Sequence, residues 1–347
     1  MFNVFQVIVL FCVSYFIYVF PFQVLLLWSF DKLLPISALV FVTFCIASLL
    51  LVYFKTKTQA KSLKLLVKFG VGVCFFLNVV VCLLCLIDYV YLLQDLTKVI
   101  FALAVTSFLV NYSLYKGKII ELKTIVIETD KIAKPCQFVF ISDVHIGTQS
   151  VEYLNMLVDK IKALNPDYVC IGGDLVDSSA VTINQLKAFK TLSMPVYFVT
   201  GNHEYYLKQS VQLLNQLKDV NIQWINNDSV QFADINIIGV NDNQSINLKN
   251  KLIKQHLDSR LFNIALVHKP HCFDPLTTKP DLMLSGHTHN GQTFPFNFVV
   301  KLNFPKCYGL YRDNNATFYV SSGAGTWGTT MRFGTVNEVV FVELKKR

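Results

Sequence analysis

Side chains that can bind metal ions recur in the second half of the chain, each group directly after a short apolar run. Five such runs end in clusters of Gly, Asp, Asn or His, and these clusters contain Asp143, His145, Asp174, Asn202, His203, His268, His287 and His289. Taken singly, an Asp beside a Gly is typical of a turn, and a lone His is usually a surface or core residue. Taken together, imidazole suits Zn, Fe and Ni, and carboxylate suits Mn and Mg. The set therefore indicates a divalent-metal site.

The size of the set favours two adjacent ions over one. Two Asp, one Asn and four His exceed the ligands of a single tetrahedral site, and no Cys joins them, which argues against a structural cysteine-type zinc site. Two ions sharing a carboxylate can clamp a phosphoryl group and lower the pKa of a bound water. His203, directly after Asn202, is the expected proton donor for the leaving group.

Alternating strands and helices are needed to bring these residues together. Periodicity predicts helices at 151–164, 182–192, 205–217 and 248–257, and strands at 123–127, 138–141, 168–171, 196–199, 235–239, 264–267, 282–284, 317–320 and 338–344. This alternation predicts a layered α/β domain. Because ligands in such sheets bind beyond the carboxyl ends of the strands, the clusters should meet on one rim, although Asp143 and His289 are far apart in sequence.

The clusters resemble the signature blocks of a known family. Asp143-Val144-His145, Gly173-Asp174, Gly201-Asn202-His203-Glu204, His268 and Gly286-His287-Thr288-His289 are similar, in order and spacing, to those of the calcineurin-like metallophosphoesterases. The stretches 286–292 and 323–338 look like the membrane-associated bacterial branch of that family, although Asn290 stands where that branch more often has Gly and Asn337 where it usually has Pro. The resemblance covers about residues 122–344.

The resemblance implies a fold and a role for each residue. The expected fold is a four-layer α/β/β/α sandwich at 116–347, preceded by an all-α transmembrane region at 1–115. The family pattern places one ion with Asp143, His145 and His289, a second with Asn202, His268 and His287, and Asp174 as the bridge. His203 would be the general acid or a donor to the substrate phosphate, and the identity of the two ions (Mn, Fe, Zn, Ni or Mg) stays open. From its charge, Arg332 is a candidate for binding the substrate phosphate.

The first 115 residues have the composition of a membrane region. They contain seven Lys, three Asp and no Glu, whereas the remaining residues carry 24 Lys or Arg and 20 Asp or Glu. Apolar runs at 1–30, 36–54, 69–93 and 99–115 predict four membrane-spanning helices, of which the last could instead be interfacial. Five Lys lie between 55 and 68. Because short Lys-rich loops stay in the cytoplasm, four spans predict a multi-pass protein whose catalytic domain is cytoplasmic.

The sequence leaves three functional classes to compare. The first is a membrane-anchored phosphodiesterase or phosphomonoesterase, and the anchor suggests a lipid-linked substrate. The second is a non-catalytic binding scaffold, which should have lost ligands, but the sequence lacks none of them. The third is a transport module with an accessory domain, which the near absence of charge within the spans disfavours. The second part of the chain shows no basic stripe with interleaved aromatics, so no dedicated nucleic-acid partner is expected. The sequence gives no indication of the oligomeric state.

Overall fold

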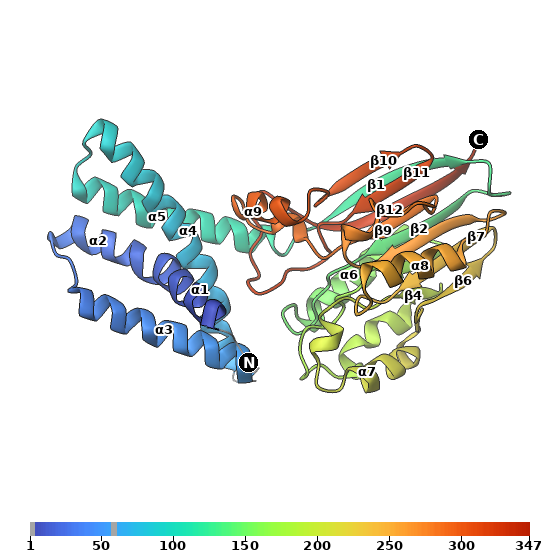
Figure 1. The fold of residues 1–347 in the computed structure, drawn as a ribbon, viewed down its shortest axis with the longest axis horizontal. Coiled ribbons are helices and arrows are strands. Elements are labelled where there is room, and N and C mark those ends of the chain that lie inside the picture. The colour runs from blue at the N-terminus through green and yellow to red at the C-terminus, as the bar shows by residue number, and fades with distance from the viewer. Residues whose placement is uncertain (1–3, 57–60) are drawn as a thin grey trace. The chain divides into compact units, whose positions relative to one another are not determined.

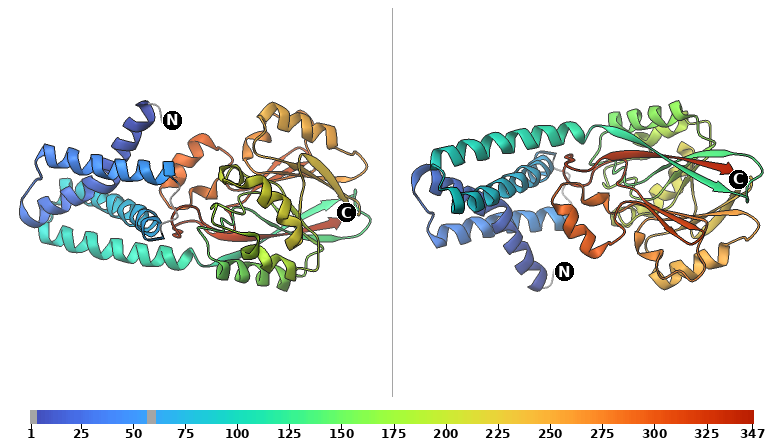
Figure 2. Two further views of the ribbon diagram at one scale, coloured as in Figure 1. Left: turned by 90° about the horizontal axis from the view of Figure 1, so that it is seen from below. Right: turned by 90° about the horizontal axis from the view of Figure 1, so that it is seen from above.

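The chain forms two compact units, which are described separately. The computed structural model describes residues 4–56 and 61–347, and the side chains of 52–66 lie outside the description. The first unit is Met1–Leu114 and the second is Tyr115–Arg347. The helices of the first unit and the sheets of the second are distinct in Figures 1 and 2.

The described part of the first unit is helical. Its elements are α1 (Val4–Ser14), a π-helical turn η1 (Tyr15–Val19), α2 (Phe20–Phe30), α3 (Ile36–Thr56), α4 (Lys61–Tyr91) and α5 (Asp95–Lys116), which runs into the second unit. Among the described residues, three stretches are long and apolar enough to cross a membrane: Val4–Phe30, Val67–Tyr91 and Asp95–Lys116. The apolar stretch Ile36–Leu51 is shorter. Three of the four predicted spans thus coincide with such stretches, and residues 52–54 of the other, predicted at 36–54, lie outside the described side chains.

The structure differs from the sequence prediction at the Lys-rich loop, whereas the last predicted span lies within a longer helix. Residues 57–60 of that loop lie outside the described residues, and α4 already begins at Lys61. The run at 99–115, the shortest by sequence, lies within the 22-residue helix α5. Lys98 is buried and contacts the carboxylates of Asp88 and Asp95, each at 2.7 Å, which joins the end of α4 to the start of α5.

The second unit contains two six-stranded sheets (Figure 1). In spatial order, the first sheet consists of β1 (Ile120–Thr129), β12 (Asn337–Lys346), β2 (Cys136–Ile141), β3 (Tyr168–Ile171), β4 (Val196–Phe198) and β5 (Ile222–Trp224). The second consists of β10 (Gly309–Asp313), β11 (Ala316–Val320), β9 (Leu282–Ser285), β8 (Phe262–Val267), β7 (Ile235–Val240) and β6 (Asp228–Phe232). Neighbours from β2 to β5 are parallel, as are those among β7, β8, β9 and β11.

Helices cover the outer face of each sheet. One apolar core lies between the sheets and contains Phe138, Tyr168, Ile237 and Leu266. A second core joins the first sheet to α6 (Val151–Leu164), α7 (Ser210–Gln216) and the 3₁₀ helices η2 (Ile183–Thr191) and η4 (Leu217–Val220). A third joins the second sheet to α8 (Ile246–His256) and η5 (Pro270–Cys272). Because their two faces are covered, the central strands are mainly apolar, as in β3 and β4. The predicted four-layer sandwich is confirmed.

Helix α6 shows how local sequence produces one of these layers. The Ser150 side chain accepts a hydrogen bond from Tyr153 N, which caps the first turn. Asn165 adopts the left-handed conformation that ends the helix. The buried face contains Leu154, Leu157, Val158 and Ile161, the four residues that the helical period places on one side. Capping and periodicity together explain why both bounds of this helix match the prediction.

Other elements depart from the sequence prediction. The helix expected at 182–192 is a 3₁₀ helix, and the one expected at 205–217 is divided into a 3₁₀ turn η3 (Glu204–Tyr206) and the shorter α7. The sequence did not predict β5, β6, β10 or α9 (Phe296–Asn303). A further 3₁₀ turn, η6 (His289–Gly291), follows β9.

One end of the sandwich gathers the features that matter for function. β1 and β12 are parallel and start together at Ile120 and Asn337. β12 is antiparallel to β2, so that its start lies beside the carboxyl end of β2, near Ile141. The Asn337 side chain donates hydrogen bonds to the carbonyls of Gly117 (2.8 Å) and Ile119 (3.3 Å). The chain therefore leaves α5 and enters the domain at the end where β2 finishes, which we call the site end.

Candidate metal centre

Every predicted metal-binding residue follows the carboxyl end of a central strand. β2 and β3 lead to Asp143, His145 and Asp174 in the first sheet, and β4 leads to Asn202 and His203. In the second sheet, β8 leads to His268, and β9 leads to His287 and His289. The two sheets thus supply opposite walls of one site, as expected for ligands at strand ends.

A first group consists of Asp143, His145 and His289, whose potential ligand atoms lie within 4.8 Å of one another. The Nε2 atoms of the two histidines are 3.0 Å apart. Asp143 Oδ1 is 3.5 Å from His289 Nε2 and 3.9 Å from His145 Nε2. Two nitrogens bound to one ion at about 2.0–2.1 Å would be roughly 2.9–3.4 Å apart. The spacing of this group therefore fits a shared cation.

A second group consists of Asp174, His268 and His287. His268 Nε2 is 3.2 Å from His287 Nδ1 and 3.2 Å from Asp174 Oδ2. The same carboxylate oxygen is 3.9 Å from His145 Nε2 of the first group. Asp174 Oδ2 thus lies between the two histidine pairs, where a bridging carboxylate would be placed. The Nδ1–H of His268 donates to the carbonyl of Gly172 at 2.8 Å, which leaves Nε2 facing the cluster.

Asn202 and His203 complete the rim from the β4 side. Asn202 Oδ1 is buried, and no donor reaches it among the described residues, although a buried acceptor normally has one. A cation would satisfy this oxygen, so the donor set fits a metal ion. His203 Nε2 lies 3.9 Å from Asp174 Oδ2, and its side chain is 15% exposed, whereas those of His145 and His268 are at most 1% exposed. His203 therefore stands between the cluster and solvent.

The backbone at the rim is strained. Five of the seven predicted ligands have positive φ: Asp143 (54°), His145 (54°), Asp174 (53°), His287 (72°) and His289 (49°). For residues other than glycine this conformation is uncommon and costs on the order of 1 kcal/mol or more each. Strain of this kind clusters at functional sites, where the fold holds side chains in a set geometry.

Burial and mutual charge set the protonation of the cluster. Burial raises the pKa of Asp143 to about 6, although the nearby charge of His268 acts to lower it. Burial also disfavours the charged forms of Asp174 and His268, but their contact holds the pKa of Asp174 well below its usual range and raises that of His268 to about 10. Burial lowers the pKa of His287 to about 3, and the charge of His268 adds to this effect. His287 is therefore neutral near pH 7, the form in which imidazole binds metal.

The sequence analysis assigned no role to Glu204. In the structure, this residue stabilises the loops that carry the predicted ligands. Its carboxylate is buried and accepts hydrogen bonds from the backbone N–H groups of Asp174 (3.0 Å), Leu175 (2.8 Å), Val176 (3.1 Å) and Gly201 (2.8 Å). Burial raises its pKa to about 7, and the neighbouring Asp174 carboxylate raises it as well. Glu204 thus ties the loop after β3 to the loop after β4. Its place directly after His203 was the only signal in the sequence.

The structure corrects the expected position of Arg332. Its side chain is fully buried, and the guanidinium donates to the carbonyls of His289 (2.8 Å), Ser322 (2.6 Å) and Gly325 (2.7 Å) and to Asn337 Oδ1 (2.8 Å). A guanidinium enclosed in this way has no face for a substrate phosphate. Arg332 instead holds the loop of His289 against the start of β12. One of its partners is Asn337, which stands where the family branch usually has Pro.

Aromatic side chains border the rim, and the sequence did not single them out. The His203 ring is 5.3 Å from the Tyr206 ring and 5.9 Å from the Trp327 ring, centroid to centroid, and both aromatic residues are more than half exposed. On the opposite side, the Phe304 ring is 5.3 Å from that of His287. These aromatic rings line the rim of the site, and no periodic pattern in the sequence predicted their positions.

Other titratable side chains lie at different distances from the centre. Asp177 Oδ2 is 3.7 Å from His145 Nδ1, and Asp242 pairs with Lys249 and Lys269 at 2.8 and 2.7 Å. The His271 ring stacks on Phe304, and His256 lies near Ser229, outside the rim. These positions bring Asp177 to the cluster and separate His256 from it.

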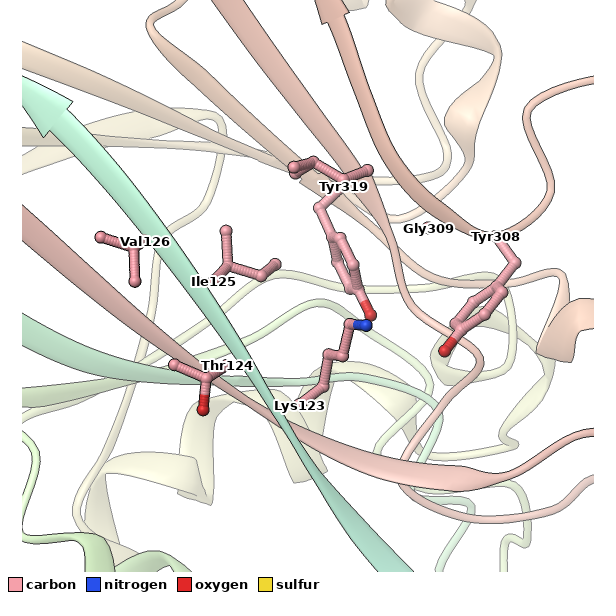
Figure 3. A pocket seen from close by; sticks show the side chains of 8 residues that line it. Lys123, Thr124, Ile125, Val126, Tyr308, Gly309 and Tyr319 are labelled. Carbon is pink, nitrogen blue, oxygen red and sulfur yellow. The ribbon is translucent and has the colours of Figure 1, made fainter.

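A separate hollow lies between the edge strands of the two sheets. It is lined by residues 123–126 of β1, by 308–310 around the start of β10 and by Tyr319. In Figure 3 the side chains of Lys123 and Tyr319 point toward one another. None of the predicted site residues lines this hollow. The strand-end centre, where the titratable groups converge, is the better candidate for chemistry.

Comparison with known proteins agrees with this geometry. Residues 136–291 match the calcineurin-like phosphoesterase family. An uncharacterized metallophosphoesterase of Helicobacter pylori is 34% identical over 242 residues, which cover 65% of this chain and 64% of the relative. One of Campylobacter jejuni is 34% identical over 241 residues, covering 65% and 63%. A transmembrane protein with metallophosphoesterase domain of Danio rerio is 29% identical over 279 residues, covering 72% and 63%.

Two mixed sheets between helical layers carry Asp and His side chains at their strand ends, and these side chains form groups that could hold a metal ion. This chain carries a calcineurin-like metallophosphoesterase domain, which confirms the resemblance seen in its sequence. Such a domain implies phosphoester hydrolysis. The matched stretches span less than two thirds of these relatives' own length.

Proposed function

We propose that the protein is a membrane-anchored phosphoester hydrolase that uses two divalent metal ions. The observation that supports this most is the position of Asp174 Oδ2, 3.2 Å from His268 Nε2 and 3.9 Å from His145 Nε2, between two histidine pairs. In this proposal Asp143, His145 and His289 hold one ion, Asn202, His268 and His287 hold the other, and Asp174 bridges them. When bound, the ions would supply Lewis acidity toward the phosphoryl oxygens and lower the pKa of water.

The protein's own residues would perform the remaining steps. His203, the ligand-cluster neighbour that faces solvent, would donate a proton to the departing alkoxide oxygen. The rings of Trp327 and Tyr206 would keep the His203 imidazole oriented and limit the access of water to it. The buried carboxylate of Glu204 would hold Asp174 in place through the backbone.

Hydrolysis of chromogenic esters tests this function. The purified full chain, stripped with a chelator, should be inactive toward bis(p-nitrophenyl) phosphate and p-nitrophenyl phosphate. Activity toward at least one of them should return on addition of Mn²⁺, Fe²⁺, Zn²⁺, Ni²⁺ or Mg²⁺, since the neutral imidazoles and carboxylates are the expected ligands. The preferred ester would decide between phosphodiesterase and phosphatase. A protein that binds metal with full stoichiometry but hydrolyses neither ester would support the scaffold alternative.

We further propose that the region 1–115 crosses the membrane and that the domain at 116–347 is cytoplasmic. The support is the set of three long apolar helices and the shorter one at Ile36–Leu51, together with the Lys cluster between 55 and 68. A reporter placed after Arg347 should be inaccessible to a membrane-impermeant label in intact cells and become accessible after lysis. Labelling in intact cells would contradict both the four-span count and the cytoplasmic side.

A further inference from the structure

Helix α9 exposes an apolar surface that its own domain does not cover. We define the α9 surface as Phe294, Phe296, Phe298, Val299 and Leu302. The exposed fractions are 45% and 48% for the first two residues, 58% and 49% for the next two, and 83% for Leu302. Single exposed apolar residues are common, but a contiguous group of this kind marks an interaction site.

The helix packs against the protein on the side of Asn297, and none of its residues is fully buried. A Cβ on Gly291 would come within 2.3 Å of the Asn297 Cα, so this residue packs against the turn η6 that follows His289. Asn297 Oδ1 is buried. At 100° per residue, Val299 and Leu302 lie on the side opposite Asn297, and Phe298 lies beside that side. A helix that served only to cover its domain would bury these three side chains and expose the amide.

The α9 surface lies at the site end of the sandwich. Phe294 N donates a hydrogen bond to the Phe333 carbonyl at 2.8 Å, and their rings are 6.5 Å apart. Four residues beyond Phe333, Asn337 holds Gly117, which directly follows α5. In both views of Figure 2, α9 projects from the end of the second unit at which β1 and β12 begin. The point where the chain leaves its last apolar helix and the α9 surface therefore share one end of the domain.

The residues that precede and follow α9 both lie next to the metal centre. η6, against which Asn297 packs, begins with His289, and the residue after α9 is Phe304, whose ring contacts that of His287. The α9 surface is therefore linked through its flanking residues to His289 and His287, two of the predicted ligands.

We propose that the α9 surface inserts into the interfacial region of a lipid bilayer and so presents the metal centre to phosphoesters at the level of the lipid headgroups. The first half of this proposal concerns the surface alone, and the second half rests on the proposed phosphoesterase function. Amphipathic helices with Phe and Leu on one face and Lys beside it bind membranes in this way. Lys301, which is exposed on α9, supplies positive charge that complements anionic headgroups, whereas Lys306 just beyond the helix pairs with Asp274 at 2.5 Å.

A bilayer fits this surface better than a second copy of the chain does. A stable protein interface buries about 800 Å² on each partner and involves about 20–30 residues a side. The α9 surface consists of five side chains on a helix of eight residues and its preceding turn, too few for such an interface. Insertion into lipid needs no complementary partner surface, and the apolar helices of the first unit already suit the chain to a membrane.

Photocrosslinking to lipid tests the first half. The full chain is reconstituted into vesicles of phosphatidylethanolamine and phosphatidylglycerol that carry a radiolabelled phospholipid, with p-benzoylphenylalanine at position 302. The matched control carries it at 126, where Val126 is 42% exposed but lies six residues along β1, roughly 20 Å from the site end. We expect lipid labelling at 302 and little at 126. Equal labelling at both positions, or a crosslink from 302 to protein alone, would overturn the proposal.

Charge substitution tests the second half. Leu302→Asp should lower kcat/KM toward a long-chain phosphodiester presented in vesicles by about tenfold, the order of effect of one leucine side chain losing an apolar environment. Its activity on soluble bis(p-nitrophenyl) phosphate should change less than twofold, and Val126→Asp should alter neither. An equal loss on both esters would contradict the role of the α9 surface. If lipid labels the chain that carries p-benzoylphenylalanine at 302, yet the wild-type chain hydrolyses neither ester, the phosphoesterase function is refuted and the docking remains.

Discussion

Asp174→Asn should remove most of the bound metal and lower phosphoester hydrolysis by about 10³-fold or more. Asp174 Oδ2 faces His145, His203 and His268, at 3.9, 3.9 and 3.2 Å. An amide in its place has one acceptor oxygen and no charge, so it cannot bridge two cations. Losing about 4 kcal/mol of the stabilisation that metal ions give a transition state corresponds to this factor. Metal content by elemental analysis and initial rates on a nitrophenyl ester measure the two effects.

Asp281→Asn is the matched control. Asp281 is also partly buried and hydrogen-bonded, to Lys131 at 2.8 Å and to the backbone N–H of Asn263 at 2.8 Å, but it precedes β9 at the end of the strand opposite the metal centre. Its substitution should leave metal content and rate near the wild-type values. Thermal unfolding of both variants separates loss of fold from loss of metal. A folded Asp174→Asn protein with full metal content and full activity would exclude the bridging assignment.

The metal centre was predictable because strand ends leave a local signature. β3 is buried on both faces, so its sequence Tyr168–Ile171 is apolar throughout, and the polar cluster that follows it marks where the strand ends. Parallel strands then bring such ends together whatever their distance along the chain. For this reason the sequence indicated that Asp143 and His289 would meet.

Elements shaped by long-range contacts were not predictable in the same way. A helix was expected from residue 205 onward, but Glu204 turns its carboxylate back to the backbone of Asp174 and Gly201, which leaves only a 3₁₀ turn before α7. From its charge, Arg332 was a candidate for binding the substrate phosphate. Its enclosure depends on carbonyls contributed by separate loops, which periodicity does not report.

The α9 surface shows a different limit of sequence reasoning. Sequence periodicity assumes that the apolar face of a helix points into the protein. In α9 the apolar residues Phe298 and Leu302 are exposed, and the side of Asn297 packs inward. A pattern of residues can reveal that a helix has two faces, but only the packing shows which face meets the domain and which is exposed.

His203→Asn should keep the metal ions and slow hydrolysis by about 10²–10⁴-fold, the usual contribution of a positioned acid or base. His203 follows Asn202, yet its Nε2 stays 3.9 Å from Asp174 Oδ2, and its side chain is more exposed than those of the buried histidines. This position suits proton donation to a leaving oxygen. His256→Asn, a histidine outside the rim that lies near Ser229, is the matched control and should leave the rate unchanged.

The effect of losing His203 should depend on the leaving group of the substrate. An alkoxide is a strong base and departs slowly without a proton, whereas nitrophenolate departs readily as the anion. The slowing caused by His203→Asn should therefore be large for an alkyl phosphodiester and much smaller for the nitrophenyl ester, at equal metal content. If His203 instead served to bind a metal ion or the substrate phosphate, both esters would be slowed by the same factor. Equal slowing would thus refute the acid role while leaving the metal centre in place, and the ratio of the two rates is the measurement that separates these roles.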